Sequence, residues 1–551
     1  MIYIISLLSV TRKTFGYRIF IFGITAGIAN AFLISVINET IKRGVQNRTP
    51  SLVLILGYVG ALLLYFCLQY FYQALLIRSS EVIIMKYRKQ LIDRIRRSSL
   101  QSYERVGNTK LFVLIAHDTN VIGQIAALSS SIIISFVVII GSLLYLLALS
   151  YKGFLVTVFI LSISLVISFS KQNFNIRRIK YGLDLQNAFF SYLRHLLDGI
   201  KEVKMDSKLN KGLYDTHVEP SMEDVARDKI DTNIFQARFS LLGPFIFFMI
   251  VGIILYVFPF LKVSITENPS QFVIVLLYIL SPLQVLIQLI PTFSRVKATT
   301  ERLESIQEML AMEEPAEHQE NGFCNKFEKI SLKEIMYHYK YNEETIEFRL
   351  GPIDLDIYAG DLIFILGGNG TGKSTFIKVL TGLYMAEKGS IHLNNITIDN
   401  NNLQDYRDLF GVIFSDNHLF DYLYGLEKIS DDTVMELIQK TGLSEKVEFR
   451  KNKFTTIDLS EGQKKRIALI SLLLKNKPVY ILDEWAANQD PSFKHFFYNT
   501  LIPELNSQNK TVIIITHDDR YLHMAKRIFK MENGLLYECP VNSYEEDSKE
   551  G

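Results

Sequence analysis

The chain has 551 residues, 49% of them apolar, and a formal net charge of only +2. This length exceeds the usual size of one domain, and so small a charge argues against nucleic acid as a partner, because phosphate binding needs a concentrated basic patch. These overall values conceal a difference in composition between the two halves of the chain. Residues before about Ile290 are apolar and interrupted by basic loops, whereas those after about Cys324 have the composition of a soluble α/β protein.

The first half contains six uncharged runs, each close to the roughly 20 residues that cross a bilayer core. The runs are 19–38, 52–77, 119–151, 153–170, 239–261 and 269–294, and only 131–149 of the third is expected to cross. Buried core helices of a large soluble protein are the alternative, but they are not kept free of charge over such long windows. The pattern therefore predicts six membrane-spanning helices.

Charges between the predicted spans indicate the orientation. The segments 78–118 and 171–238 are rich in Lys and Arg, whereas the other three connections hold only Lys42, Arg43, Arg48, Lys152 and Lys262. The positive-inside rule then places both long segments and both termini in the cytoplasm. Loops this long normally have structure of their own. We therefore expect the helices to continue below the membrane and to meet the second half of the chain.

The strongest chemical pattern follows the apolar run 362–366. It reads Gly367, Gly368, Asn369, Gly370, Thr371, Gly372, Lys373, Ser374, Thr375. A strand, this loop and a helix in that order form a phosphate-binding loop, in which backbone N–H groups and the helix N-terminus surround the β- and γ-phosphates. Lys373 adds a positive charge, and the Ser374 hydroxyl is placed to bind Mg²⁺. The pattern predicts ATP and Mg²⁺ as cofactors.

A second strand pattern, 479–482, ends in Asp483 and Glu484. Asp483 at the end of a strand can hold Mg²⁺ through water, and Glu484 can activate the attacking water as a general base. An isolated Asp–Glu pair is more often a solvated strand end. Because this pair follows a phosphate-binding loop by about a hundred residues, the functional interpretation is favoured.

Between these motifs lies the segment Leu459, Ser460, Glu461, Gly462, Gln463, Lys464, Lys465, Arg466. With it the chain resembles the ATP-binding cassette superfamily, whose signature reads Leu-Ser-Gly-Gly-Gln. The resemblance implies that Ser460, Gly462 and Gln463 face the ATP of a second copy. It further implies that Tyr339 stacks on adenine, that His517 contacts the γ-phosphate, and that Asp490 belongs to the loop after the catalytic glutamate. The implied catalytic residues are Glu484 and His517.

The resemblance also implies the architecture: an all-α domain of six transmembrane helices over residues 1–310, a linker over 311–325, and an α/β nucleotide-binding domain over 326–551. Two positions depart from the superfamily pattern. Glu461 replaces the first glycine of the signature pair. Ser415 stands where most members have a glutamine that reaches Mg²⁺, and serine is too short to do so, so Asp416 or a water would have to take its place.

Other features are similar to a bacterial subfamily that exports cyclic peptides and siderophores, including pyoverdine precursors, syringomycin-like lipopeptides and a lariat-peptide microcin. These features are the Gly-Gly-Asn-Gly sequence before Lys373 and the segments 416–421, 483–491 and 517–521, with weaker support from 199–205. The resemblance implies an exporter in the bacterial inner membrane. Because the chain has one cassette and the superfamily encloses ATP between two, a homodimer is the simplest assembly.

The exported molecule is the least constrained feature. Polar residues within the spans are candidates for a substrate cavity: Gln69, Gln73, Ser281, Gln284, Gln288. Such residues usually face protein or water, and amides among aromatic rings suit a bulky peptide-like or siderophore-like molecule. Hydrogen bonding between helices is an equally good explanation. A lipid or multidrug flippase has the same architecture, and a non-transporting ATP-gated regulator is a further alternative. The expected partners are a second copy, membrane lipid and the exported molecule.

Overall fold

The computed structural model describes residues 17–45, 51–170, 172–260, 269–311, 327–342, 345–416 and 418–540. The chain divides into two compact units, of which the first comprises Met1–Arg96 and Tyr103–Met312 and the second Arg97–Ser102 and Glu313–Gly551. The predicted linker 311–325 lies almost entirely outside the described residues.

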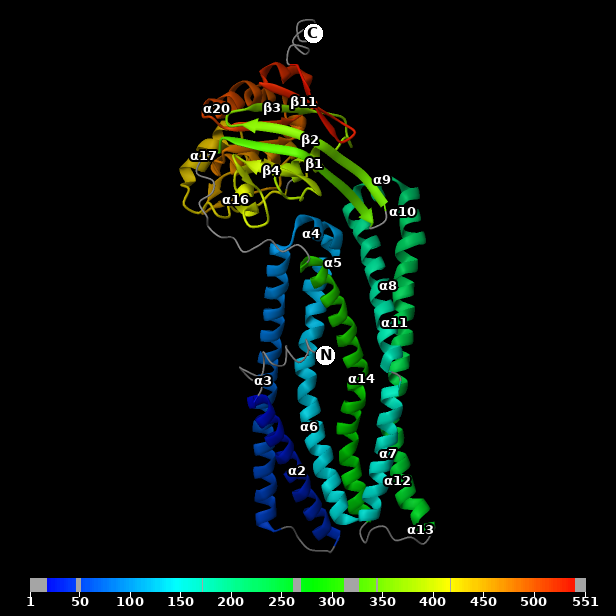
Figure 1. Cartoon of the computed structure of the whole chain (residues 1–551). Helices are drawn as coiled ribbons and strands as arrows, with labels where there is room; N and C mark the ends of the chain where they lie inside the picture. Colours follow the sequence, from blue (N-terminus) through cyan, green and yellow to red (C-terminus); the bar gives the residue numbers. More distant parts are fainter. Residues whose placement is uncertain are drawn as a thin grey trace. The chain divides into compact units, whose positions relative to one another are not determined.

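The first unit is helical, and its long helices run side by side (Figure 1). They are α2 (Tyr17–Val45), α3 (Leu52–Arg97), α6 (Thr119–Leu149), α7 (Tyr151–Ser170), α8 (Gln172–Asp198), α11 (Glu219–Ser240), α12 (Leu242–Gly252) and α14 (Pro269–Ala311). Short helices connect them: α4 (Leu100–Val106), α5 (Asn108–Val113), α9 (Ile200–Met205), α10 (Ser207–Leu213) and α13 (Phe258–Phe260). Among the described residues this part also contains the π-helical turns η2 (Leu114–Asp118), η3 (Tyr214–Val218) and η4 (Ile253–Val257).

The six apolar runs are helical in their described part, apart from Ser150 between α6 and α7 and Leu241 between α11 and α12. Among the described residues, α3 alone meets the length and hydropathy of a full span. Shorter apolar stretches occur at Ile21–Ile37, Ile134–Leu149, Tyr151–Ile163, Pro244–Val257 and Phe272–Leu286. With 46 residues, α3 is roughly 70 Å long and exceeds a bilayer core of about 30 Å. The expected continuation of a span beyond the membrane is therefore present in α3.

The helices of the first unit are held together by apolar contacts at one end of α14 and by polar contacts farther along it. Phe247 and Ile250 of α12 are buried in one apolar cluster with Phe272 of α14. Farther along α14, an Arg302 guanidinium nitrogen lies 3.5 Å from Oδ2 of Asp118, whose side chain is 2% exposed. Arg302 also donates a hydrogen bond of 3.1 Å to Asn187 Oδ1 on α8. A buried ion pair with a further hydrogen-bond partner is a costly arrangement that fixes three segments in one register.

The second unit is an α/β fold with two main sheets. The larger sheet has the order β12-β11-β3-β10-β9-β6 and is parallel apart from β12. Its strands are β3 (Leu362–Leu366), β6 (Phe410–Ile413), β9 (Val479–Asp483), β10 (Thr511–Ile515), β11 (Arg527–Glu532) and β12 (Leu535–Cys539). The antiparallel sheet contains β1 (Lys329–Asn342), β2 (Thr345–Tyr358), β4 (Lys388–Leu393) and β5 (Ile396–Thr397). A small hairpin pairs β7 (Phe449–Arg450) with β8 (Lys453–Phe454).

Helices connect and cover these strands (Figure 1). They are α15 (Lys373–Leu380), α16 (Leu403–Arg407), α17 (Asp431–Lys440), α18 (Glu461–Leu474), α19 (Pro491–Phe496) and α20 (Ile502–Ser507), with the short turns η5 (Trp485–Asn488), η6 (Phe497–Leu501) and η7 (Asp519–Met524). Strands β3, β9 and β10 are buried along their whole length, as expected for parallel strands covered on both faces.

The register of the parallel sheet places three chain segments at one edge. Ile515 of β10 is paired with Asp483 of β9 on one side and with Ile365 of β3 on the other. The three strands therefore end level with one another, and the residues that follow them lie together at their carboxyl ends. This is the edge at which open α/β sheets bind their ligands.

Residues 97–102, which run from the last residue of α3 into the start of α4, belong to the second unit, whereas the rest of both helices belongs to the first. Leu100 packs against the apolar core formed by the antiparallel sheet and α15. Gln101 Nε2 donates a hydrogen bond of 2.5 Å to the hydroxyl of Tyr337, whose ring stacks on that of Tyr384. The turn after α3 is thus part of the α/β unit's packing.

Candidate active site

Lys373 stands at the centre of the carboxyl edge of the parallel sheet. Its side chain is 6% exposed, and Nζ donates hydrogen bonds to the carbonyls of Gly367 (2.7 Å) and Gly368 (2.9 Å). The same Nζ lies 3.5 Å from Glu484 Oε1 and 3.2 Å from His517 Nε2. One ammonium group therefore touches residues that follow β3, β9 and β10.

Glu484 is held in a specific orientation at the end of β9. Its backbone is left-handed, with φ 49° and ψ 31°, a conformation that side chains other than glycine seldom adopt. Its N–H donates to the carbonyl of Ile515 (3.0 Å), and Oε1 lies 2.9 Å from His517 Nε2. Burial raises the pKa of Glu484, but the His517 hydrogen bond and the Lys373 charge outweigh it and hold the pKa below its ordinary value. The carboxylate is thus ionised and able to accept a proton.

Asp483 and Ser374 form the second polar pair of the site. Asp483 is only 1% exposed and accepts a hydrogen bond of 3.3 Å from the Ser374 hydroxyl. Burial raises the pKa of this carboxyl, and the charge of Glu484 raises it further, although hydrogen bonds from Ser415 and Ser374 act in the opposite direction. A buried hydroxyl–carboxylate pair beside a phosphate loop matches the ligand chemistry of Mg²⁺, which takes few protein ligands and shares phosphate oxygens. In the described residues, no group of three or more His, Cys, Asp or Glu forms a separate metal cluster.

The phosphate-binding loop has the shape that its glycines predict. At Gly372, the N-cap of α15, φ is +105°, and a Cβ would lie 2.5 Å from the ring of Phe348. Phe348 on β2 pairs in register with Tyr339 on β1. The half-buried Tyr339 therefore lies next to Phe348, the residue whose ring faces Gly372 of the loop, and its stacking on adenine stays a prediction.

The signature segment forms the start of α18. Ser460 is the N-cap residue, and its N–H donates to Gln463 Oε1 at 3.3 Å. Glu461 is exposed and pairs with Lys464 at 3.1 Å, so its departure from the signature glycine is accommodated at the surface. Gly462 has a packing role that the sequence did not reveal, because a Cβ there would lie 2.5 Å from the carbonyl oxygen of Asn488.

The loop after Glu484 is bonded to α18. Gln489 Nε2 donates to the Gly462 carbonyl at 2.9 Å, and its Oε1 accepts from Arg466 Nε at 2.9 Å. Asp490 is the N-cap of α19 and accepts hydrogen bonds from Ser492, from the N–H of Phe493 and from Arg466. The bond from Ser492, followed by the other two, lowers the pKa of Asp490 to about 2.

Two residues of this region escaped the sequence analysis as functional candidates. Lys465 is buried in α18 and donates from Nζ to the main-chain carbonyl of Glu484 at 2.9 Å. Trp485 is 1% exposed and donates from Nε1 to the carbonyl of Lys465 at 2.8 Å. A lysine inside a helix and a tryptophan after a strand carry no pairing signal in sequence. The single tryptophan of the chain, directly after the Asp–Glu pair, was the one available hint.

The predicted substrate residues lie in the first unit. Gln69 is half-buried, and its Oε1 is a buried oxygen with no hydrogen-bond partner in the described part of the chain. Gln73 and Ser281 are exposed and Gln284 is half-buried, whereas the side chain of Gln288 lies outside the described set. No hydrogen bond or ion pair joins these positions among the side chains that the structure describes, so their role as one cavity stays a prediction.

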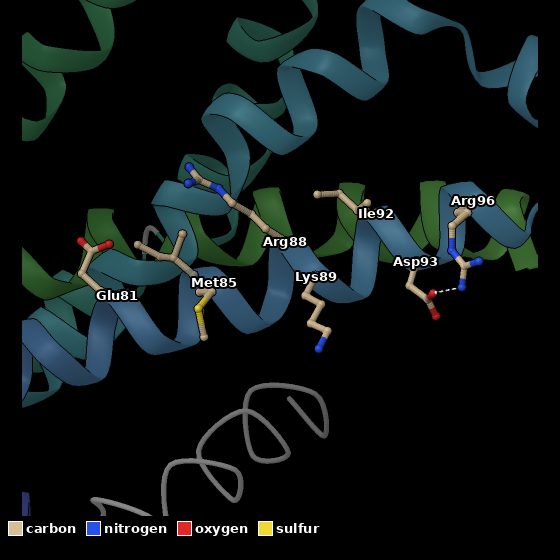
Figure 2. A pocket seen from close by; sticks show the side chains of 8 residues that line it. Glu81, Met85, Arg88, Lys89, Ile92, Asp93 and Arg96 are labelled. Atoms are coloured by element: carbon tan, nitrogen blue, oxygen red, sulfur yellow. Dashed lines mark hydrogen bonds and ion pairs between the residues drawn. The ribbon is translucent and has the colours of Figure 1, made fainter. Parts of the chain in front are cut away.

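A different pocket, of about 460 Å³, lies farther along α3 (Figure 2). Its lining residues are Glu81, Ile84, Met85, Arg88, Lys89, Ile92, Asp93 and Arg96. Arg88 donates from Nε to Thr119 Oγ1 at 3.1 Å, and Arg96 pairs with Asp93 at 2.8 Å. These charges belong to the part of α3 that extends beyond its apolar stretch, and Gln69 and Gln73 do not line this pocket.

Comparison with known proteins agrees with this geometry. Residues 350–487 match the family model described as ABC transporter. ATP-binding protein SyrD of Pseudomonas syringae pv. syringae is 31% identical over 530 residues, which cover 93% of this chain and 92% of that protein. Energy-coupling factor transporter ATP-binding protein EcfA1 of Mycoplasmoides gallisepticum is 31% identical over 226 residues, 38% of this chain and 77% of its own.

A solved structure of a bacterial Atm1-family ABC exporter with ATP bound is similar in fold, with a TM-score of 0.71 and 16% identity over 96% of this chain and 95% of that chain. The predicted fold class, an α-helical membrane domain followed by an α/β nucleotide-binding domain, is confirmed by this match together with the family model. The assembled phosphate site and the full-length similarity lead to one conclusion: the chain belongs to the ABC transporter family and is a membrane-embedded ATPase, coupled to transport, with an exporter fold.

Proposed function

We propose that this chain forms a homodimer that uses ATP to export a bulky, peptide-like or siderophore-like molecule across the bacterial inner membrane. The observation that carries this proposal is the pairing, in one chain, of one complete phosphate site with one signature helix. The Glu484 base, the Lys373 ammonium and the Ser374–Asp483 pair meet at one sheet edge. The same chain carries the helical first unit, which we expect to span the membrane.

The chemistry follows from the contacts of Lys373. ATP phosphates compete with the Glu484 carboxylate for its ammonium group, which frees Glu484 to take a proton from the attacking water. His517, already 2.9 Å from Glu484, holds that carboxylate in place. The superfamily resemblance implies that His517 also contacts the γ-phosphate. Mg²⁺, bound by Ser374 and, through water, by Asp483, would supply charge neutralisation at the β- and γ-phosphate oxygens.

The dimer follows from the position of the signature. The superfamily resemblance implies that Ser460, Gly462 and Gln463 contact the ATP held by the phosphate loop of another copy. Two identical chains related by a two-fold axis supply two equivalent sites. ATP binding then joins the cassettes, and hydrolysis separates them.

Residues 97–102 offer a route for transmitting this movement. Leu100 and Gln101 are packed into the α/β unit, yet they follow directly after α3. A displacement of the cassette would therefore move the end of α3, the helix that we expect to enter the membrane. Export results when the two states bind the substrate with different affinity and open to different sides. The positive-inside rule gives the sides: both termini and residues 78–118 and 171–238 in the cytoplasm.

Reconstitution into proteoliposomes tests the proposal. ATP hydrolysis should rise when cyclic or siderophore-type peptides are added, and these peptides should accumulate inside vesicles whose cassettes face outward. Lys373→Ala should abolish both. Stimulation by lipid with movement of a fluorescent lipid would identify a flippase instead. Nucleotide binding without any transported species would identify an ATP-gated regulator.

A further inference from the structure

The signature helix and the catalytic loop of one chain are joined by two reciprocal hydrogen bonds. Lys465 Nζ on α18 donates to the main-chain carbonyl of Glu484 at 2.9 Å. Trp485 Nε1, in the next residue of the loop, donates back to the carbonyl of Lys465 at 2.8 Å. Both residues are buried, with Lys465 9% and Trp485 1% exposed. Two bonds of opposite direction, one buried and one partly buried, fix the loop against the helix more firmly than either would alone.

A buried lysine in this place needs an explanation. Burial lowers the pKa of Lys465, although the charges of Glu484, Asp483 and Glu461 oppose the shift. An ammonium group loses hydration when it is buried, so an apolar side chain of similar length would pack here with a smaller desolvation free energy. Trp485 would not require the lysine side chain either, because its indole bonds to the Lys465 backbone. The contact that depends on this side chain is the one to Glu484.

The Glu484 backbone has a conformation that needs support. Its φ of 49° places a carboxylate-bearing residue in the left-handed region, where non-glycine residues are disfavoured. Its N–H is held by the carbonyl of Ile515 at 3.0 Å, and its carbonyl is held by Lys465. With a bond on each side of Cα, both backbone dihedrals are constrained. The direction of the side chain toward Lys373 and His517 is constrained with them.

We propose that Lys465 is a positioning residue for the catalytic base: its ammonium group holds the Glu484 carbonyl and thereby aims the carboxylate at the attacking water. This inference rests on the proposed function of Glu484 as that base. Ser460, at the N-terminus of the same helix, is expected to face the nucleotide of the partner. Lys465 therefore connects the helix expected to contact the partner's ATP to the base expected to hydrolyse the ATP bound by its own chain.

The indole of Trp485 gives this connection a rigid anchor. Its ring packs against Phe497 with centroids 4.4 Å apart and against Phe493 at 5.9 Å. These aromatic side chains belong to the buried core on one side of the parallel sheet. A shift of α18 is therefore transmitted to a loop that cannot rotate freely, so the Glu484 carbonyl must follow it.

The test uses Lys465→Met in the full-length protein, since methionine keeps an unbranched apolar stem without the ammonium group. The matched control is Lys475→Met, at the exposed C-terminal end of the same helix. We expect Lys465→Met to lower kcat for ATP about 10- to 100-fold, the range expected when a reacting group is misplaced, and to leave the Kd for ATP within about twofold, because no phosphate contact is removed. The control should match the wild type in both quantities.

A double-mutant cycle with Glu484→Gln separates positioning from general stability. If Lys465 acts through the carboxylate, Lys465→Met should reduce the residual turnover of Glu484→Gln by less than about twofold. Equal reductions in both backgrounds would show a merely structural role and overturn the inference. If Lys465→Met does not fold, Lys465→Gln replaces it under the same criteria, because its amide is one bond shorter and loses the direct contact.

The outcomes distinguish this inference from the proposed function. An active wild type with an equally active Lys465→Met would refute the positioning role and leave the ATP-driven exporter intact. A wild type that binds ATP but never hydrolyses it would overturn the proposed function, and the positioning role would fall with it.

Discussion

Replacing Glu484 by glutamine should slow ATP hydrolysis while strengthening ATP binding. Glutamine preserves the shape of the side chain and can still contact His517, which lies 2.9 Å from Oε1 in the wild type. It cannot accept a proton from water at neutral pH. General-base catalysis contributes about 10²- to 10⁴-fold to a rate, so we expect kcat to fall by at least about 100-fold.

The effect on affinity follows from the contact between Glu484 and Lys373. Their charged atoms are 3.5 Å apart, which corresponds to a gross attraction of about 5 kcal/mol at an effective dielectric constant of about 20. Solvent reaches 31% of the glutamate side chain, and desolvation offsets much of the attraction, so a net value of about 0.5–1 kcal/mol is realistic. ATP must displace this contact to bind Lys373. Its removal should therefore lower the Kd for ATP about two- to fivefold.

Two measurements on purified protein in detergent or lipid check these values: steady-state phosphate release for kcat, and equilibrium binding of ATP for the Kd. Glu504→Gln is the matched control, because this carboxylate also pairs with a lysine, Lys440, at 2.7 Å but lies on α20. Turnover by Glu484→Gln within a few-fold of the wild type would refute the general-base assignment. Weaker ATP binding by this variant would refute the competition for Lys373.

Three further outcomes are expected. Gly462→Ala should destabilise the protein by about 1–3 kcal/mol in denaturant unfolding, because the new Cβ would lie 2.5 Å from the Asn488 carbonyl oxygen; unchanged stability would mean that the loop can yield. The pKa of Asp490 is lowered from 3.8 to about 2, so the stability it contributes is present above about pH 4 and is lost as the pH falls to about 2. Asp490→Asn should flatten the pH dependence of unfolding in that window, and an identical acid profile would contradict the assigned contacts. Replacing Gln284 and Gln288 by leucine should leave basal ATP hydrolysis nearly unchanged and abolish stimulation by substrate; lower thermal stability with normal stimulation would instead indicate interhelical hydrogen bonds of roughly 0.6 kcal/mol each.

Local patterns were sufficient to predict much of this protein. The phosphate-binding loop was predictable because its glycines, lysine and serine are consecutive, and the structure brings Lys373 and Ser374 to the predicted sheet edge. The positions of Glu484 and His517 at one sheet edge were predictable, because each residue follows an apolar strand and parallel strands end at the same edge. The helical character of the first unit was predictable from its long uncharged runs, and α3 has the length and hydropathy of a full span among the described residues, whereas the six predicted spans stay a prediction.

Contacts between distant segments were not predictable in the same way. Lys465 is joined to Glu484, 19 positions away, and to Trp485, 20 positions away, by one hydrogen bond each, and a backbone carbonyl accepts both bonds. Backbone acceptors exist at every residue, so the sequence cannot show which one a side chain will reach. The packing role of Gly462 against Asn488 has the same origin. The sequence analysis likewise did not predict the π-helical turns in the helical unit, such as Ile253–Val257.

Ser415 shows how a missing side chain can be replaced by a different arrangement. The sequence suggested that Ser415, Asp416 or a water would take over a glutamine's contact with Mg²⁺. In the structure the Ser415 N–H and hydroxyl both bond to the carboxylate of Asp483, which also accepts from Ser374. Three donors on one buried carboxylate favour its ionised form, against the burial that raises its pKa. Ser415, in the segment that follows β6, therefore contacts the Asp483 carboxylate, and the pKa of that carboxyl stays above its ordinary value because burial and the charge of Glu484 outweigh the three donors.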